Sequence, residues 1–182
     1  MAVFGIETLK SKIGSFAKGN RYNVSFSGLP TGLDTTVNEN LQYLCESVSL
    51  PTKGIASNPQ DIYGPPREIP YRETFTEAAL SFILDDAFDL KRFFDEWQTK
   101  IINPETGNVA NYWNNFTGSV LISRLPNAAV NMAGGSDKYK IELREAYPSA
   151  VGELALGHTQ GSEILRLSVT FKYRKWISRN IT

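Results

Sequence analysis

Side chains that commonly carry catalysis are sparse in this sequence of 182 residues. The single histidine, His158, lies in a polar segment between Gly157 and Gly161. A general base or a metal ligand needs partners, and no cysteine or carboxylate accompanies His158 at the spacing of a zinc site or of a catalytic triad. We therefore interpret His158 as an exposed turn residue.

Cys45 and the pair Asp85–Asp86 are the other residues whose chemistry needs weighing. Cys45 is the single cysteine, so the chain has no internal disulfide. Its position within a predicted strand favours a small buried apolar residue over a nucleophile. Asp85 and Asp86 could hold a metal or act as paired acids, but they precede a predicted helix, where acidic side chains cap backbone N–H groups. With no glycine-rich phosphate-binding motif either, we expect no enzyme, no metal and no cofactor.

Charge is concentrated only at the end of the chain. Nineteen basic and nineteen acidic side chains cancel overall, so the net charge argues for neither a nucleic-acid nor a membrane partner. After Ile164, however, the chain carries basic residues and no acidic one: Arg166, Lys172, Arg174, Lys175 and Arg179. With Tyr173 and Trp176 among them, this tail could contact single-stranded nucleic acid. The alternative, which we favour, is a solvated strand face whose charge is balanced by acids elsewhere.

Most of the chain alternates apolar and polar side chains with a period of two, as half-buried β-strands do. The longest run covers residues 165–174, with leucine, valine and aromatic side chains on one face and Arg166, Ser168, Thr170 and Lys172 on the other. Further strands are predicted at residues 21–27, 41–49, 76–84, 118–124 and 138–145. Residues 51–70, rich in proline and glycine, predict a loop with one irregular edge strand near 67–71. This series predicts a mainly β fold, an antiparallel sandwich or barrel.

One amphipathic helix flanks the predicted sandwich. Its apolar stripe recurs at intervals of three and four residues: Leu90, Phe93, Phe94, Trp97 and Ile101. We expect Asp85–Asp86 to cap its start and Asn103–Pro104 to end it. A weaker stripe at residues 5–17 predicts a short helix in an N-terminal arm, residues 1–20, of a single domain spanning residues 1–182.

The predicted loop at residues 103–117 is unusual because it carries three aromatic residues, Tyr112, Trp113 and Phe116. Long loops are commonly functional, and aromatic side chains in them are commonly contact residues. No apolar run approaches the roughly 18 residues of a membrane span, and the start of the chain lacks the apolar core of a signal peptide. We therefore expect a cytosolic product without a membrane partner.

Four sequence blocks, taken in order, resemble the tail tube proteins of contractile-tailed, myovirus-type phages. They are RYNVSFSG from residue 21, LQYLCESVSLP from residue 41, ETFTEAALSFILDDAFDLKRFFDEWQTKI from residue 73, and YPSAVGEL from residue 147 with the strand that follows it. The helix ending in Trp97–Gln98 and the YPSAVGEL corner are the most specific of these features. The loops at residues 54–66 and 103–118 match no family pattern.

The resemblance implies a β-sandwich with a flanking helix, shared by the type VI secretion tube protein. It implies hexameric rings that stack head to tail into a tube, lined by a continuous barrel of strands. The tube would hold the tape-measure protein, pass double-stranded DNA without sequence specificity, and contact the tail sheath, baseplate and tail-terminator proteins. The location would be the virion tail, and the host cytoplasm during assembly.

Site residues follow from combining the resemblance with the residue patterns. The polar positions of the last long strand, Arg166, Ser168, Thr170 and Lys172, are candidates for the lumen. Tyr112, Trp113 and Phe116 are candidates for contacts between rings. Two alternatives stay open: a baseplate or neck protein of the same fold that initiates or terminates the tube, and a β-barrel module that binds single-stranded nucleic acid.

Overall fold

The computed structural model describes Ile6 and residues 17–61, 64–109, 113–126, 139–157 and 164–179. The strands within these residues are β1 (Tyr22–Ser27), β2 (Cys45–Val48), β3 (Lys53–Gln60), β4 (Arg67–Phe75), β5 (Ala78–Ile83), β6 (Gly118–Arg124), β7 (Tyr139–Val151), β8 (Arg166–Lys172) and β9 (Lys175–Arg179). The helices are α2 (Thr35–Leu44), α3 (Asp89–Ile101) and α4 (Trp113–Phe116). No helix in the described part of the chain is long and apolar enough to cross a membrane.

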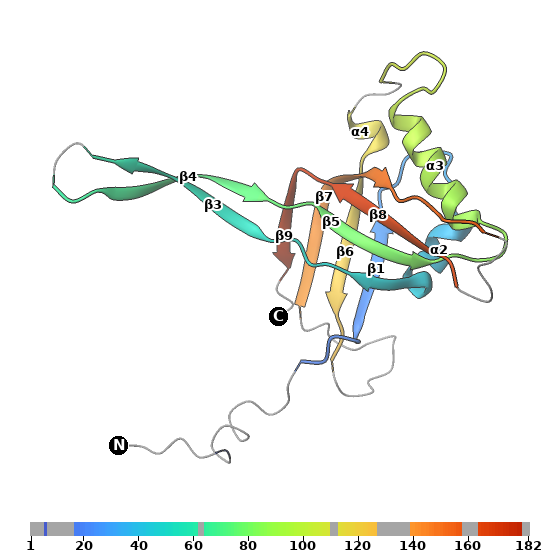
Figure 1. Ribbon diagram of the computed structural model, residues 1–182, viewed down its shortest axis with the longest axis horizontal. Helices are drawn as coiled ribbons and strands as arrows, with labels where there is room; N and C mark the ends of the chain where they lie inside the picture. The colour runs from blue at the N-terminus through green and yellow to red at the C-terminus, as the bar shows by residue number, and fades with distance from the viewer. Residues whose placement is uncertain are drawn as a thin grey trace.

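The strands form two antiparallel layers that share β7 (Figure 1). The first part of β7 pairs with β6 and β9, and β6 pairs with β1. The second part of β7, from Tyr147, pairs with β8, which continues to β5 and β2. Between the two parts lies Glu145, whose φ of 55° is rare for a residue with a side chain. The predicted antiparallel β-sandwich is confirmed.

The core lies between the two layers and is closed by helix α3. Alternate residues of β8 (Leu167, Val169 and Phe171) are fully buried, as the period of two predicts. Phe171 contacts the rings of Phe94 and Trp97 at centroid distances of 6.0 and 6.1 Å. The helix therefore seals the sandwich with the aromatic stripe that the sequence predicts.

The start of α3 differs from the prediction. Phe88, in a left-handed conformation with φ of 56°, precedes the helix, and no side chain at that position caps it. Asp85 and Asp86 do not cap the helix, because the N-cap position is Phe88. They belong to the turn before it, in which Phe88 N donates to Asp85 O at 3.2 Å. Asp89 does lie in the first turn, where the helix dipole favours a negative charge.

The predicted strand at residues 41–49 is also wrong over its first half, which belongs to α2. The side chain of Asp34 caps that helix by accepting a hydrogen bond from Thr36 N at 2.9 Å. Val37 and Leu41, one turn apart, face the core. Cys45 ends the helix and begins β2, so it does not lie in mid-strand, although it is buried as expected.

Residues 51–70, predicted mostly as loop, form much of a long two-stranded hairpin, β3–β4, that projects far from the sandwich (Figure 1). It continues β2 and β5: Ser49 N donates to Ala79 O and Thr76 N to Thr52 O. A ribbon of only two strands has an open side on each strand, so it tolerates Pro59 and Pro70.

The corner predicted at Tyr147 is a continuation of β7 with a register shift between Pro148 and Ala150. Within the predicted loop at residues 103–117, the structure adds the short helix α4. The predicted helix at residues 5–17 and the turn around His158 lie outside the described residues, Ile6 and Ala17 apart.

Candidate functional site: a polar sheet face with open edges

The outer face of the β7–β8–β5–β2 sheet is polar and lined by small side chains. The register places Ser168 opposite Ser81, and Thr170 opposite both Ala79 and Ala150. Ser81 also faces Ser47 of β2. A band of hydroxyl and methyl groups therefore crosses all four strands.

Gly152, just after β7, fits this close packing. A Cβ atom at Gly152 would lie 2.2 Å from Ser168 Oγ and 3.0 Å from Ser168 O. The amide of Gly152 donates to Ser168 O at 2.7 Å. Glycine is thus the residue that lets the end of β7 lie directly against β8.

Charged side chains lie at the two ends of β8 on this face, and each is paired. Arg166 Nε lies 2.7 Å from Glu46 Oε2, and Lys172 Nζ lies 3.4 Å from Glu77 Oε1. Exposed pairs of this kind contribute about 0–1 kcal/mol to stability. Their larger effect is on the charge of this face, because the carboxylates of Glu46 and Glu77 neutralise Arg166 and Lys172.

All four predicted residues, Arg166, Ser168, Thr170 and Lys172, therefore share one face. Reasoning from the sequence missed their partners, Glu46 and Glu77, and the serines that continue the band. The alternation in residues 78–83 could have revealed Ala79 and Ser81. Nothing local could have revealed Glu46, which is 120 residues from Arg166.

The end of β8 is anchored to the base of the hairpin. Tyr173 Oη donates to Thr76 O at 2.6 Å, and the rings of Tyr173 and Phe75 lie 6.0 Å apart. Burial raises the pKa of Tyr173 to about 12, so the phenol stays protonated and remains a donor.

This sheet ends in two open edges. Among the described strands, β2 pairs only with β5, and the second part of β7 pairs only with β8. Open edges carry backbone donors and acceptors that invite pairing with another chain. The two open edges of the sheet are formed by different strands, one by β2 and the other by the second part of β7.

The hairpin carries apolar side chains that the described part of the subunit leaves exposed. Ile55, Ile69 and Tyr71 are 67%, 45% and 63% exposed. The register shift between Ala56 and Ser57 breaks the alternation, because Asn58 then pairs with Ile69. Ile55 and Ile69 therefore lie on opposite faces of the ribbon, and Tyr71 lies at the shift. A two-stranded hairpin is marginally stable on its own, so the hairpin is a candidate contact surface.

The predicted contact aromatics have different environments. Trp113 is 43% exposed and donates its indole N–H to Glu145 Oε2 at 2.6 Å. Phe116 is buried against the rings of Trp113 and Tyr147. Tyr112 lies outside the described residues. Of the two described members, Trp113 is therefore the exposed one and Phe116 is buried.

The carboxylate of Glu145 accepts hydrogen bonds from more than one side chain. Besides the indole of Trp113, Arg174 Nη1 donates to it at 2.9 Å. The hydrogen bond from Arg174 first, and that from Trp113 second, lower the pKa of Glu145 below its ordinary value. The carboxylate is therefore held ionised beside the bend of β7.

Of the residues weighed for catalysis, Cys45 is described and is unreactive, and His158 lies outside the described residues. Burial raises the pKa of the Cys45 thiol to about 11, so it is protonated at neutral pH. No cluster of three or more histidine, cysteine, aspartate or glutamate side chains within the described ranges could hold a metal ion.

Comparison with known proteins extends over almost the whole chain. The model of the phage tail tube protein family matches residues 17–179. Tail tube protein gp19 of Enterobacteria phage T4 is 24% identical over 166 residues, which cover 90% of this chain and 92% of gp19.

Solved structures with a similar fold include a chain of an extracellular contractile injection system and a chain of the anti-feeding prophage. A chain of the PVC sheath-tube complex in the extended state is 13% identical, with a TM-score of 0.58 over 98% of this chain and 100% of its own. A chain of the anti-feeding prophage tube-terminating cap is 15% identical, with a TM-score of 0.63 over 92% of this chain and 93% of its own. At these identities the likeness shows a shared fold.

Proposed function

The chain belongs to the family of phage tail tube proteins, whose model matches it over residues 17–179, and from that membership we propose how it builds the tube. It is a structural subunit of a phage tail tube. Copies close into hexameric rings, and the rings stack head to tail. The outer face of the β7–β8–β5–β2 sheet lines the lumen.

The observation that carries this proposal is a sheet with an open edge at each end and a hydroxyl-rich outer face. Pairing the β2 edge of one subunit with the β7 edge of the next satisfies both edges at once. Repeated around a ring, this pairing closes a barrel and leaves no free edge. The contact is heterologous, so the two faces of the ring differ and rings stack in one direction. The six-fold order rests on the family.

The lumen face is suited to a polymer that passes without being held. Unpaired arginine or lysine side chains would bind DNA phosphates tightly. Here Arg166 and Lys172 are each paired with a carboxylate, and small side chains lie between them. Such a surface would accommodate the tape-measure protein and then double-stranded DNA without sequence specificity.

The β3–β4 hairpin supplies the second contact within a ring. It extends β2 and β5 away from the subunit, so its exposed apolar side chains reach a neighbouring copy. Ile55, Ile69 and Tyr71 would be buried in that contact. Burial against a neighbour would explain why these apolar side chains are exposed in the isolated subunit.

The remaining partners and the location follow from the family. We assign the outside of the tube to the tail sheath and its two ends to baseplate and tail-terminator proteins. The subunit would assemble in the host cytoplasm, reside in the virion tail, and carry out no catalysis.

A tube-initiating or tube-terminating role is the alternative within the same fold. The likeness to the tube-terminating cap, with a TM-score of 0.63, favours it. The nucleic-acid module is less well supported, because basic residues of the tail pair with acids: Arg166 with Glu46, Lys172 with Glu77, Arg174 with Glu145 and Arg179 with Glu142.

Negative-stain microscopy and light scattering of the purified chain at increasing concentration separate these roles. Tubes that form without nucleic acid would support the tube subunit. Single rings that never stack would favour the capping role. A protein that stays monomeric at every concentration, and binds short oligonucleotides in a salt-dependent manner, would contradict both.

A further inference from the structure

The turn after α3 presents two apolar side chains on an internally bonded backbone. Ile102 and Val109 face each other in an isolated antiparallel bridge and are 51% and 67% exposed. Two backbone hydrogen bonds that involve Asn103, of 2.8 and 3.0 Å, hold the turn between them. Glu105 is the charged residue of this turn. We name residues 102–109 the α3 loop.

The α3 loop lies beside the β7 edge, on the core side of the β7–β8–β5–β2 sheet. Ile102 and Pro104 line a cavity of about 660 Å³ together with residues 147–149 of β7. Helix α3 packs on the buried face of the sheet, where Trp97 contacts Phe171. The loop that follows the helix is therefore on the side opposite to the proposed lumen.

A groove of about 660 Å³ opens at the other edge of this sheet, beside β2. Its apolar lining comes from both layers of the sandwich: Tyr22, Val48, Leu50, Ile122 and Tyr139. Val48 pairs with Leu80, which is buried, and paired residues share one face of a sheet. The groove is therefore also on the core side. We name it the β2 groove.

The α3 loop and the β2 groove lie at corresponding positions along the strands. Pro148, beside the loop, pairs with Phe171, which pairs with Ala78. Next to Ala78, Ala79 O accepts from Ser49 N at 2.9 Å. One row of the sheet thus runs from the loop at the β7 edge to the groove at the β2 edge. Pairing the two edges of neighbouring copies would bring loop and groove together on the same side of the joined sheet.

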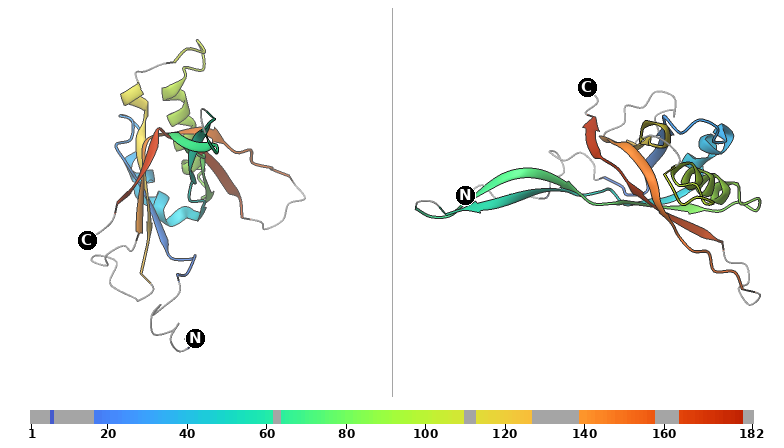
Figure 2. Two further views of the ribbon diagram at one scale, coloured as in Figure 1. Left: turned by 90° about the vertical axis from the view of Figure 1, so that its left-hand side faces the viewer. Right: turned by 90° about the horizontal axis from the view of Figure 1, so that it is seen from above.

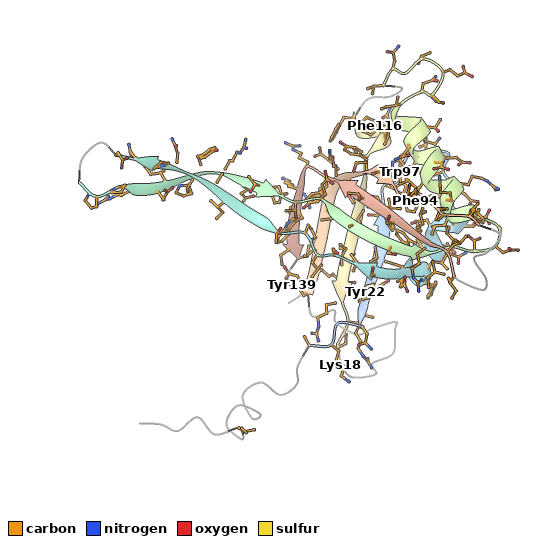
Figure 3. The ribbon with its side chains drawn as sticks, in the orientation of Figure 1. Lys18, Tyr22, Phe94, Trp97, Phe116 and Tyr139 are labelled. Atoms are coloured by element: carbon orange, nitrogen blue, oxygen red, sulfur yellow. The ribbon has the colours of Figure 1, made fainter. Side chains whose placement is uncertain are left out.

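The figures show the two features at the ends of the subunit that edge pairing joins. In Figure 1 and in the left panel of Figure 2, the α3 loop extends beyond α3 at the top, where β7 bounds the sheet. Figure 3 labels Lys18, Tyr22 and Tyr139, which line the groove, at the lower end, away from Trp97 and Phe116. The top of one copy therefore faces the bottom of the next around the ring.

We propose that the α3 loop of one copy inserts into the β2 groove of its neighbour in the same ring, an inference that rests on the proposed function. Ile102 and Val109 would pack against the apolar lining, including Leu50, which is 55% exposed. Because the backbone of the loop is already hydrogen-bonded, little conformational entropy is lost on docking.

The charges of the two features are complementary. Lys18 and Arg21 line the groove. The acid in its lining, Glu46, already pairs with Arg166 at 2.7 Å. Glu105 of the inserted loop would bring a carboxylate to this basic rim, and complementary charges favour one partner and one orientation over others.

The complementarity favours the α3 loop over the chain's own N-terminal residues as the occupant. Residues 1–16 precede Ala17, which lines the groove, and they carry an apolar stripe. Their charged side chains are Glu7, Lys10 and Lys12, so they would add positive charge to a basic rim. The α3 loop has the opposite sign.

The contact would fix the register of the two paired edges. A slip by one residue turns every side chain of a strand to the other face, but a slip by two residues does not. Backbone pairing alone therefore leaves more than one register open to the β2 and β7 edges. Insertion of the loop would select the register in which the loop meets the groove.

Thiol cross-linking of assembled rings tests the contact directly. In the Val109→Cys/Leu50→Cys double variant, a bis-maleimide reagent with a flexible spacer should join each subunit to both ring neighbours. The products on a denaturing gel should form a ladder that ends at the hexamer. Either single variant should stay monomeric, because Cys45 is buried. A ladder that continues past the hexamer would place the contact between rings and overturn the proposal.

Microscopy of the unsubstituted chain comes first, so that the proposed function and this inference fail separately. A chain that forms no rings overturns the tube assignment and this inference with it. Rings in which the double variant gives no ladder overturn the docking alone. In that case, a cross-link within single subunits of Ile13→Cys/Leu50→Cys, detected by mass spectrometry, would identify the N-terminal residues as the occupant.

Charge reversal gives an independent readout. Glu105→Lys should raise the protein concentration needed for ring formation about tenfold, the equivalent of about 1.4 kcal/mol. Adding Lys18→Glu should restore much of the loss. Asp86→Lys, at an exposed position in the turn after the central strand β5, is the matched control and should assemble like the unsubstituted chain. Equal behaviour of Glu105→Lys and Asp86→Lys would contradict the proposal.

Discussion

The sandwich and the β3–β4 hairpin are both antiparallel β-structure, yet they depend on different partners. In the sandwich, strands such as β8 bury alternate residues against a facing layer or a helix, as Leu167, Val169 and Phe171 do. The hairpin has no facing layer, and its apolar residues Ile55 and Tyr71 are mostly exposed. Antiparallel β-structure is thus stabilised within the subunit in the sandwich, whereas in the hairpin it depends on contacts with a neighbouring subunit.

The largest effect is expected where the sandwich is sealed. Trp97 is fully buried, contacts Phe171 and donates its indole N–H to Phe116 O at 2.7 Å. Trp97→Ala should lower the free energy of unfolding of the subunit by about 3–5 kcal/mol. Chemical denaturation measures it. An unchanged midpoint would mean that α3 does not close the core.

A smaller effect is expected where β7 lies against β8. Gly152→Ala would place a methyl group 2.2 Å from Ser168 Oγ. The hydroxyl can rotate away, but the carbonyl of Ser168 at 3.0 Å cannot, so we expect a loss of about 1 kcal/mol. Ser168→Ala in the same chain should recover part of it. Additive losses in the double variant would argue against this close approach.

The bend of β7 should respond to pH. The pKa of Glu145 is lowered in the folded state, so its contribution is present above its ordinary pKa of 4.5 and is lost as the pH falls through the folded value. Between about pH 5 and about pH 3, the unsubstituted subunit should lose more thermal stability than Glu145→Gln. Parallel melting curves for the two proteins would contradict the role of Arg174 and Trp113.

The smallest effect on the subunit, and the sharpest contrast, is expected in the hairpin. Ile55→Ser/Tyr71→Ser removes apolar groups that are already exposed, so the free energy of unfolding should stay within roughly 0.5 kcal/mol. Ring formation should nevertheless be lost, because the neighbour would no longer bury these groups. Denaturation measures the free energy of unfolding, and sedimentation of the same sample measures ring formation. Intact rings would show that the hairpin does not contribute to the contact between subunits.

The same contrast explains what the sequence could predict. The strands and α3 bury one face, so their periodicity identifies them, and it also groups Arg166, Ser168, Thr170 and Lys172. Residues 41–44 could not be assigned, because Leu41 and Leu44 have the spacing of a helix stripe, whereas Leu41, Tyr43 and Cys45 alternate as in a strand. The edge strand predicted near residues 67–71 lies in β4. The rest of the hairpin was not predicted, because it buries neither face and contains Pro59 and Pro70. The acids that neutralise the polar face come from distant parts of the chain, so only the fold reveals them.

Hydrogen exchange of the hairpin, measured on dilute subunits and on assembled tubes, tests most directly whether this region depends on a neighbour. We expect fast exchange of the β3 and β4 amides in the free subunit and strong protection in the tube. Buried amides of β8 serve as the reference and should be protected in both samples. Equal exchange of the hairpin amides in the two samples would show that the hairpin does not depend on a neighbouring subunit.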